Sequence, residues 1–205
     1  GSIKAVQRAI VLARGYRQSS ADRPDCRAVD PDNRLLWRFR RGRLDLEAMR
    51  DTLLAVSGRL DRRMGGRSVD VAGDAENRRR TVYGLVDRQS LPASFRAFDF
   101  ASPDVSVDRR PFTTVPQQAL FGMNAPFVVA QAKALAARPE IQAAGSPALQ
   151  VRALYRLVLA RPAEPGEVAA GLNFLAAVPD QATQLSPLEQ FAQVLLLTNE
   201  LMFVD

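Results

Sequence analysis

The sequence predicts a mainly α-helical, compact fold with one small β element. Three observations support this prediction. Apolar residues recur at spacings of three and four in several segments, prolines stand at the start of successive apolar runs, and two short stretches alone have the character of strands. With 205 residues, of which 47% are hydrophobic and 24% charged, the chain is long enough to bury one sizeable core.

The first segment, residues 3–14, predicts an amphipathic helix. Ile3, Val6 and Ile10 fall on one face of this helix, and charged or amide side chains lie mostly on the opposite face. Gly15 follows the periodic pattern and suits a C-terminal cap, so the helix is expected to end there.

A loop, a short helix and a long helix are expected next. Residues 19–33 hold two prolines and several turn-forming residues, which predicts a loop. Asn33 is then placed to cap a short helix over residues 34–41. The following residues, 44–61, predict a longer helix, because its apolar positions repeat at spacings of three and four: Leu46, Met49, Leu53, Val56 and Leu60.

The β element is expected in the middle of the chain. Residues 81–87 are β-branched and aromatic and are flanked by charged residues, and residues 68–71 offer a second short strand. Together they predict a two-stranded hairpin around 68–71 and 81–87.

The C-terminal part predicts a series of helices, because proline suits the first position of a helix and cannot lie in its interior. A serine at 186 with Glu189 three residues later forms a capping-box pattern before the last of them. The expected helix starts are Pro116, Pro126, Pro147, Pro165 and Pro187.

Charge divides the chain unevenly. Residues 1–110 hold 23 basic and 15 acidic side chains, whereas residues 111–205 hold 5 and 7. This asymmetry predicts a basic helical subdomain over 3–110 and a helical subdomain over 111–205, packed as one compact unit. Almost all basic residues are arginines, whose planar guanidinium groups suit carboxylates, phosphates and aromatic faces.

Two absences from the sequence limit the chemistry. There is no histidine, the commonest general base and metal ligand. The single cysteine, Cys26, excludes an internal disulfide and a cysteine-rich metal site, and leaves open whether its thiol is free or pairs with another chain. We therefore expect no catalytic, metal or cofactor residues within this domain.

The stretch Tyr16, Arg17, Gln18, Ser19 and Ser20 is a candidate binding or structural motif. A nucleophilic serine would need a nearby base, and the absence of histidine argues against one. We expect Tyr16 to be packed, Arg17 to pair with a carboxylate from residues 43–51, and the last three residues to bond loop backbone. An alternative places this motif with Arg50 and Asp51 in a catalytic cleft that neighbouring domains complete.

Arginine also forms a candidate basic surface. Arg34, Arg38 and Arg41 would share one face of the expected helix, beside aromatic residues. Arginine with aromatic side chains is typical of nucleic-acid surfaces. Ion pairs with nearby acidic residues explain the same pattern, which argues against nucleic acid as the partner. An acidic glycan is the other candidate partner.

Several long motifs follow one another in an order that resembles a known family. They are "SIKAVQRAIVLARGYRQSS", "DPDNRLLWRFRRGRLDLEAMRDTLLAVSGRLD", "RRTVYGLVDR", "RPFTTVPQQALFGMNAPFV" and "ALYRLVLARPAEPGEV". Together they resemble the planctomycete cytochrome-associated C-terminal domain, the family of unknown function 1553. The resemblance implies an extracytoplasmic domain at the C-terminal end of a large exported protein with a c-type cytochrome domain, in which any haem would belong to that other domain.

We therefore expect a non-catalytic accessory module that interacts with other domains of its parent protein and does not span a membrane. One alternative is a domain of a hydrolytic or polysaccharide-acting enzyme. A second alternative is a binder of anionic polymer, acidic glycan or nucleic acid, through the arginine-rich half of the chain.

Overall fold

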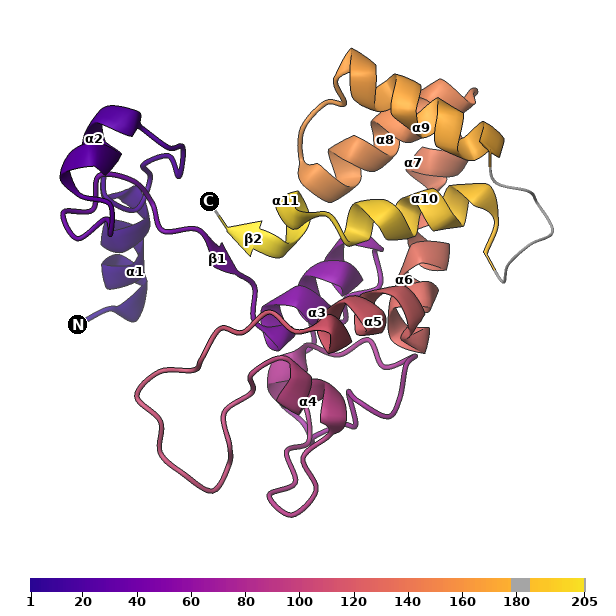
Figure 1. Cartoon of the computed structure of the whole chain (residues 1–205). Helices are drawn as coiled ribbons and strands as arrows, with labels where there is room; N and C mark the ends of the chain where they lie inside the picture. The colour runs from indigo at the N-terminus through magenta and orange to yellow at the C-terminus, as the bar shows by residue number, and fades with distance from the viewer. Residues whose placement is uncertain (178–184, 205) are drawn as a thin grey trace. The chain divides into compact units, whose positions relative to one another are not determined.

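The computed structural model describes residues 1–177 and 185–204, and within them the chain is mainly helical with one two-stranded sheet (Figure 1). The predicted fold class is confirmed. The chain forms two compact units, Gly1–Arg43 with the C-terminal residues from Phe203, and Leu44–Met202. Residue 110 lies inside the second unit, and the subdomain boundary indicated by the charges stays a prediction.

The N-terminal unit begins with helix α1 (Ile3–Leu12), whose first turn is capped by the Ser2 hydroxyl. The sequence predicted a helix end at Gly15, but the helix ends three residues earlier, at Leu12. From Ala13 the backbone turns, because the amides of Tyr16 and Arg17 both donate to the Ala13 carbonyl oxygen, each at 3.1 Å.

Residues 19–41 differ most from the sequence-based expectation. The predicted loop contains helix α2 (Pro24–Val29), which starts with proline and carries Asp25 in its first turn. The predicted helix over 34–41 is absent from this described segment. Asn33 and Leu36 have left-handed backbone angles, each with φ 55°, which a continuous right-handed helix excludes.

The small sheet also lies elsewhere than predicted. Strand β1 (Gly42–Arg43) pairs antiparallel with β2 (Phe203–Val204). In the described part of the chain, residues 68–71 and 81–87 instead meet at one isolated parallel bridge, and Thr81–Tyr83 form the 3₁₀ turn η1. The physical reason is Asp51, a residue of the helix that follows β1. Its carboxylate accepts both the amide and the hydroxyl of Thr81 at 2.7 Å, and these bonds hold residue 81 against that helix.

The second unit contains the predicted helices, and each start expected from proline is confirmed. Both halves of the capping box form, since the Ser186 amide donates to Glu189 and the Glu189 amide to the Ser186 hydroxyl. The elements are α3 (Leu46–Val56), η1, α4 (Ala93–Ala97), α5 (Pro116–Asn124), α6 (Pro126–Ala136), α7 (Pro139–Gln142), α8 (Pro147–Leu159), α9 (Pro165–Ala177), α10 (Pro187–Leu196) and α11 (Asn199–Met202).

One hydrophobic core holds the second unit together. Helix α10 packs between α6 and the pair α8–α9, while α3 and α5 contact α6 (Figure 1). At Gly171 of α9, an added Cβ would lie 3.0 Å from both Phe191 and Val151, so the absence of a side chain lets these helices approach. The fully buried apolar side chains include Leu53, Leu54, Val128, Leu135, Ile141, Val151, Leu154 and Leu196.

An arginine-centred cluster joins the ends of three helices of this unit. Arg161, just after α8, donates to Glu167 of α9 at 2.7 and 2.8 Å and to Glu200 of α11 at 2.7 Å. The Arg161 guanidinium, together with the Glu164 amide, lowers the pKa of Glu167 from 4.5 to about 2. The ionised carboxylate of Glu167 therefore stabilises the folded state more than the unfolded state.

This cluster predicts a specific acid sensitivity. Because the pKa of Glu167 is depressed on folding, its contribution is complete above about pH 4.5 and is lost as the pH falls towards about 2. Arg161→Ala should lower the midpoint of urea denaturation at neutral pH. The midpoint of this variant should also decrease less than that of the unaltered protein as the pH falls from about 4.5 to about 2. Arg156→Ala, at an exposed position of α8, is the control. Equal pH profiles for the two variants would contradict the prediction.

Candidate functional site

The predicted motif at residues 16–20 holds two segments of the N-terminal unit together. The Tyr16 ring meets the Phe39 ring edge to face at a centroid distance of 5.8 Å. Gln18 Nε2 donates to the Leu36 carbonyl oxygen at 2.9 Å, and the Ser19 carbonyl oxygen accepts the Phe39 amide at 3.0 Å. The motif thus connects the end of α1 to residues 34–41, which we call the arginine-rich segment.

The serines and Arg17 of this motif have distinct surroundings. The Ser19 hydroxyl accepts the amide of Ala21 at 3.0 Å, a local turn contact. Arg17 is exposed, and its expected pairing with a carboxylate from residues 43–51 stays a prediction. Within the second unit, both carboxylates of α3 already have partners, Glu47 in Arg110 and Asp51 in Thr81.

One acidic side chain, Asp30, and one amide side chain, Asn33, determine the backbone course of the arginine-rich segment. The Asp30 carboxylate accepts the amides of Arg34 and Leu35 at 2.9 and 2.7 Å, and these two bonds, with that of Leu35 the stronger, lower the pKa of Asp30. The Asn33 side chain bonds the backbone of Arg38 twice, donating to its carbonyl oxygen at 2.9 Å and accepting its amide at 3.2 Å. This local bonding replaces the helical bonds that the sequence pattern suggested.

Trp37 is bonded to the backbone just before the segment and contacted by two arginines. Its indole Nε1 donates to the Asp30 carbonyl oxygen at 2.8 Å. The guanidinium carbons of Arg38 and Arg23 lie 4.7 and 5.7 Å from its ring centroid, within the range of cation–π contacts. Arg23 also donates to the Trp37 carbonyl oxygen at 2.7 Å, so two arginines fix this ring.

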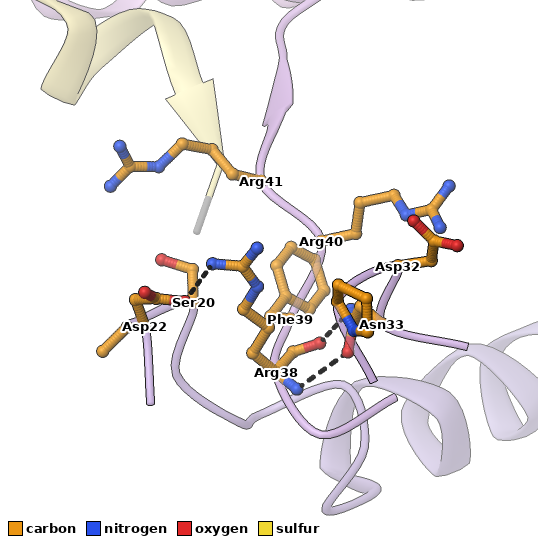
Figure 2. Close-up of a pocket in the computed structure, with 10 residues that line it drawn as sticks. Ser20, Asp22, Asp32, Asn33, Arg38, Phe39, Arg40 and Arg41 are labelled. Atoms are coloured by element: carbon orange, nitrogen blue, oxygen red, sulfur yellow. Dashed lines mark hydrogen bonds and ion pairs between the residues drawn. The ribbon is translucent and has the colours of Figure 1, made fainter. Parts of the chain in front are cut away.

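A cavity of about 570 Å³ opens in the N-terminal unit beside this segment. We call it the arginine pocket, and it is lined by Ser20, Ala21, Asp22, Pro31, Asp32, Asn33, Arg38, Phe39, Arg40 and Arg41. Figure 2 shows the three arginine side chains pointing in different directions from one extended segment, so they could contact several charges along a ligand. The volume falls in the range of ordinary ligand pockets.

The electrostatics of the pocket are unbalanced. Arg38 pairs with Asp22 at 3.1 Å, and Asp22 is shared with Arg27 at 3.0 Å. Arg40 is exposed and has no ion-pair partner among the residues that the structure describes. The whole stretch 1–43 carries 11 basic and 4 acidic side chains, a net charge of +7, whereas residues 44–202 carry 17 of each.

The basic surface predicted from the sequence stays a prediction, but the structure shows where its three arginines lie. Arg38 and Arg41 line the arginine pocket, but Arg34 does not, because the expected helix that would align all three is not formed. Sequence reasoning missed Arg40. The helix expected over 34–41 would have placed Arg40 on a different face from Arg34, Arg38 and Arg41, so the helical spacing gave no signal for it.

Arg50 and Asp51 belong to the second unit and contact the loop before η1. Arg50 donates to the carbonyl oxygens of Asn77 and Arg79, while Asp51 binds Thr81 and Arg80. Ser20 lines the arginine pocket and Arg50 lines a different cavity. A role for these residues in one catalytic cleft stays a prediction.

The described residues lack both a metal-binding cluster and a membrane-spanning helix. Across residues 1–177 and 185–204, no cluster of three or more cysteine or acidic side chains is arranged to hold a metal ion. In the same residues, no helix is long and apolar enough to cross a membrane. The expectation that this domain binds no cofactor stays a prediction.

Comparison with known proteins identifies a family. The sequence matches the family described as "PSD1: Protein of unknown function (DUF1553)" over residues 1–175. The match covers most of the chain, so the chain belongs to this family. Neither the curated proteins nor the solved structures contain a match.

Proposed function

We propose that this member of the DUF1553 family is a non-catalytic interaction module whose N-terminal unit binds an acidic glycan through the arginine pocket. The concentration of charge is the observation that carries the proposal. All of the excess positive charge of residues 1–204 lies in residues 1–43, the part of the chain that contains the pocket. A protein surface of this kind attracts polyanions over distances of about 10 Å at moderate salt.

Arginine favours carboxylate ligands in particular. The guanidinium group presents a fork of N–H donors that can bind both oxygens of a carboxylate. Arg40 offers such donors at an exposed position, and Arg38 is held beside it by Asp22 and Asn33. A polyuronate chain, with one carboxylate on each sugar, matches a pocket whose arginines point in different directions.

The aromatic residues of the segment favour a glycan over nucleic acid. Single-stranded nucleic acid binds best where bases stack on open aromatic faces. Here the Trp37 ring is contacted by the guanidinium groups of Arg23 and Arg38, and the Phe39 ring packs on Tyr16. These rings already have partners, so charge recognition is the stronger part of binding.

The motif resemblance supports a wider proposal about the parent protein. We place the module in a large exported protein with a c-type cytochrome domain, whose haem would lie outside the present chain. In that setting the module works outside the cytoplasm and contacts other domains of its parent. Acid-rich polysaccharide is then a ligand that the module could meet.

The proposal predicts salt-dependent binding of polygalacturonate by the whole chain. We expect binding in calorimetry or biolayer interferometry at about 50 mM salt, with an affinity that falls steadily as salt is raised, because ion contacts release counterions. A single-stranded oligonucleotide of equal charge should bind more weakly. Dextran sulfate distinguishes carboxylate from sulfate recognition.

Two outcomes would overturn the proposal. Absence of polygalacturonate binding at about 50 mM salt would remove the anionic-polymer function, since electrostatic binding is strongest there. Tighter binding of the oligonucleotide than of polygalacturonate would reassign the pocket to nucleic acid.

A further inference from the structure

We propose that the second unit contains a separate binding site for a small apolar carboxylate, in the cavity beside Arg50. The cavity has a volume of about 300 Å³ and lies among residues of α3, α4, α5, α6 and the loop 71–75. Its apolar lining consists of Leu46, Val71, Ala72, Ala75, Phe95, Phe121, Ala125, Pro126 and Phe127. Arg50 is the charged residue of this lining.

Arg50 is almost completely buried, with 4% of its surface exposed. Its Nη1 donates to the Arg79 carbonyl oxygen at 2.8 Å and to the Thr81 hydroxyl at 3.3 Å, and its Nη2 to the Asn77 carbonyl oxygen at 2.5 Å. The Nε–H is also buried, and among residues 1–177 and 185–204 it has no hydrogen-bond acceptor. A buried donor of this kind costs free energy until an acceptor satisfies it.

The positive charge of Arg50 is not matched by a direct ion pair within the described residues. All the acceptors that it binds are neutral oxygens, and its guanidinium carbon lies 4.8 Å from the centroid of the Phe127 ring. The nearest acidic neighbour in sequence, Asp51, directs its carboxylate to Thr81 and Arg80. Burial lowers the pKa of Arg50, and the charges of Asp51 and Asp74 offset part of that effect.

The contacts of Arg50 with Asn77 and Arg79 have a structural role, because they fasten the loop before η1 to α3. They do not use the Nε–H, and they do not neutralise the charge. Buried charges are normally paired, since an unpaired charge in an apolar environment is unfavourable. A ligand carboxylate would supply both the missing acceptor and the missing negative charge.

The rest of the cavity selects the remainder of the ligand. Three phenylalanines, with aliphatic side chains beside them, would surround an apolar group. At about 30 Å³ for each water-sized group, the cavity holds roughly ten such groups. This suits a short fatty acid or an aryl acid, whereas a polyuronate is too large and too polar to enter.

The loop 71–75, which forms one wall of the cavity, is ordered by its own hydrogen bonds before any ligand binds. The Asp70 carboxylate accepts the amides of Ala72 and Gly73 at 3.0 and 2.7 Å, which closes a tight turn. At Gly73 a Cβ atom would lie 2.4 Å from the Asp70 carboxylate, so a larger residue would open this turn. A preformed wall reduces the cost of ordering when a ligand binds.

The test compares carboxylates with their uncharged counterparts on the intact chain. Hexanoate and phenylacetate, and the amides hexanamide and phenylacetamide, are titrated by ligand-observed NMR and calorimetry. We expect both acids to bind, and each amide to bind at least about tenfold more weakly, because it lacks the charge that pairs with Arg50. This comparison uses the unaltered protein, so it needs no folded variant.

Three variants, one of them a control, locate the site. Ala75→Leu adds volume to the cavity lining and should weaken hexanoate binding by about tenfold or more. Ala55→Leu, the same change at an exposed position of α3, should leave the affinity unchanged. Arg50→Gln should abolish the preference for the acid over the amide. Thermal unfolding of each variant shows whether it folds.

The proposal is overturned if neither acid binds at a concentration of about 10 mM. A dissociation constant of that size corresponds to a binding free energy of only about −3 kcal/mol. Equal affinities for acid and amide would also overturn it, as would an unchanged affinity in folded Ala75→Leu. These results leave polygalacturonate binding by the N-terminal unit untouched, so the two proposals fail independently.

Discussion

Replacing Arg40 and Arg41 by glutamate is expected to weaken polygalacturonate binding by about 100-fold at about 50 mM salt. Both side chains line the arginine pocket and both are exposed. Reversing each charge replaces an attraction with a repulsion at the position where the ligand carboxylates would lie. A 100-fold loss corresponds to about 2.7 kcal/mol, or about 1.4 kcal/mol for each reversed charge.

The matched control is Arg8→Glu on α1 with Arg14→Glu in the turn after it, which makes the same change of charge within the same unit. Neither residue lines the arginine pocket. We expect the control to lose less than about threefold in affinity, because it alters long-range attraction and no direct contact. Equal losses in the two double variants, measured by calorimetry at one salt concentration, would show that net charge alone drives binding.

The second large effect concerns the core of the second unit. Leu54→Ala is expected to lower the free energy of unfolding by about 2–5 kcal/mol, since the lost side chain leaves a cavity that the surrounding helices fill incompletely. Leu54 is fully buried on α3. Urea denaturation followed by circular dichroism measures the change.

Leu149→Ala is the control for this prediction, because Leu149 lies on α8 with 52% of its surface exposed. It should change the free energy of unfolding by about 0.5 kcal/mol or less. If both variants lost the same small amount, Leu54 would not belong to a tightly packed core.

The helices of the second unit could be predicted because their signals are local. Pro126 and Pro187 each stand at the first position of a helix, and Ser186 caps the helix that follows it. Such signals depend on residues within one turn, so a reading of the sequence alone detects them. The buried positions Leu46, Met49 and Leu53 follow from periodicity for the same reason.

The segment around the arginine pocket could not be predicted in this way. Its apolar and basic spacing is compatible with a helix, yet the side chains of Asp30 and Asn33 bond the backbone and turn the chain. Whether such a side chain captures the backbone depends on geometry that spacing does not encode. Consequently Arg38 and Arg41 were identified, whereas Arg40 was missed and Arg34 lies outside the pocket.

The small sheet shows a second limit. Gly42 pairs with Val204, a partner distant in sequence, and two residues in each strand give almost no local signal. The stretch 81–87 had the stronger strand composition, but the bonds of Thr81 to Asp51 hold its start in a 3₁₀ turn. Tertiary bonding outweighed β propensity at this position.

The most direct test of the arginine pocket is an NMR titration of the whole ¹⁵N-labelled chain with a short galacturonate oligomer. Binding in the pocket predicts that the amide signals of residues 20–22, 32–33 and 38–41 shift together and saturate at one affinity. The signals of α1 and of the second unit should change little. Shifts centred on the second unit, or no saturable shift at about 50 mM salt, would contradict recognition of acidic glycan by this pocket.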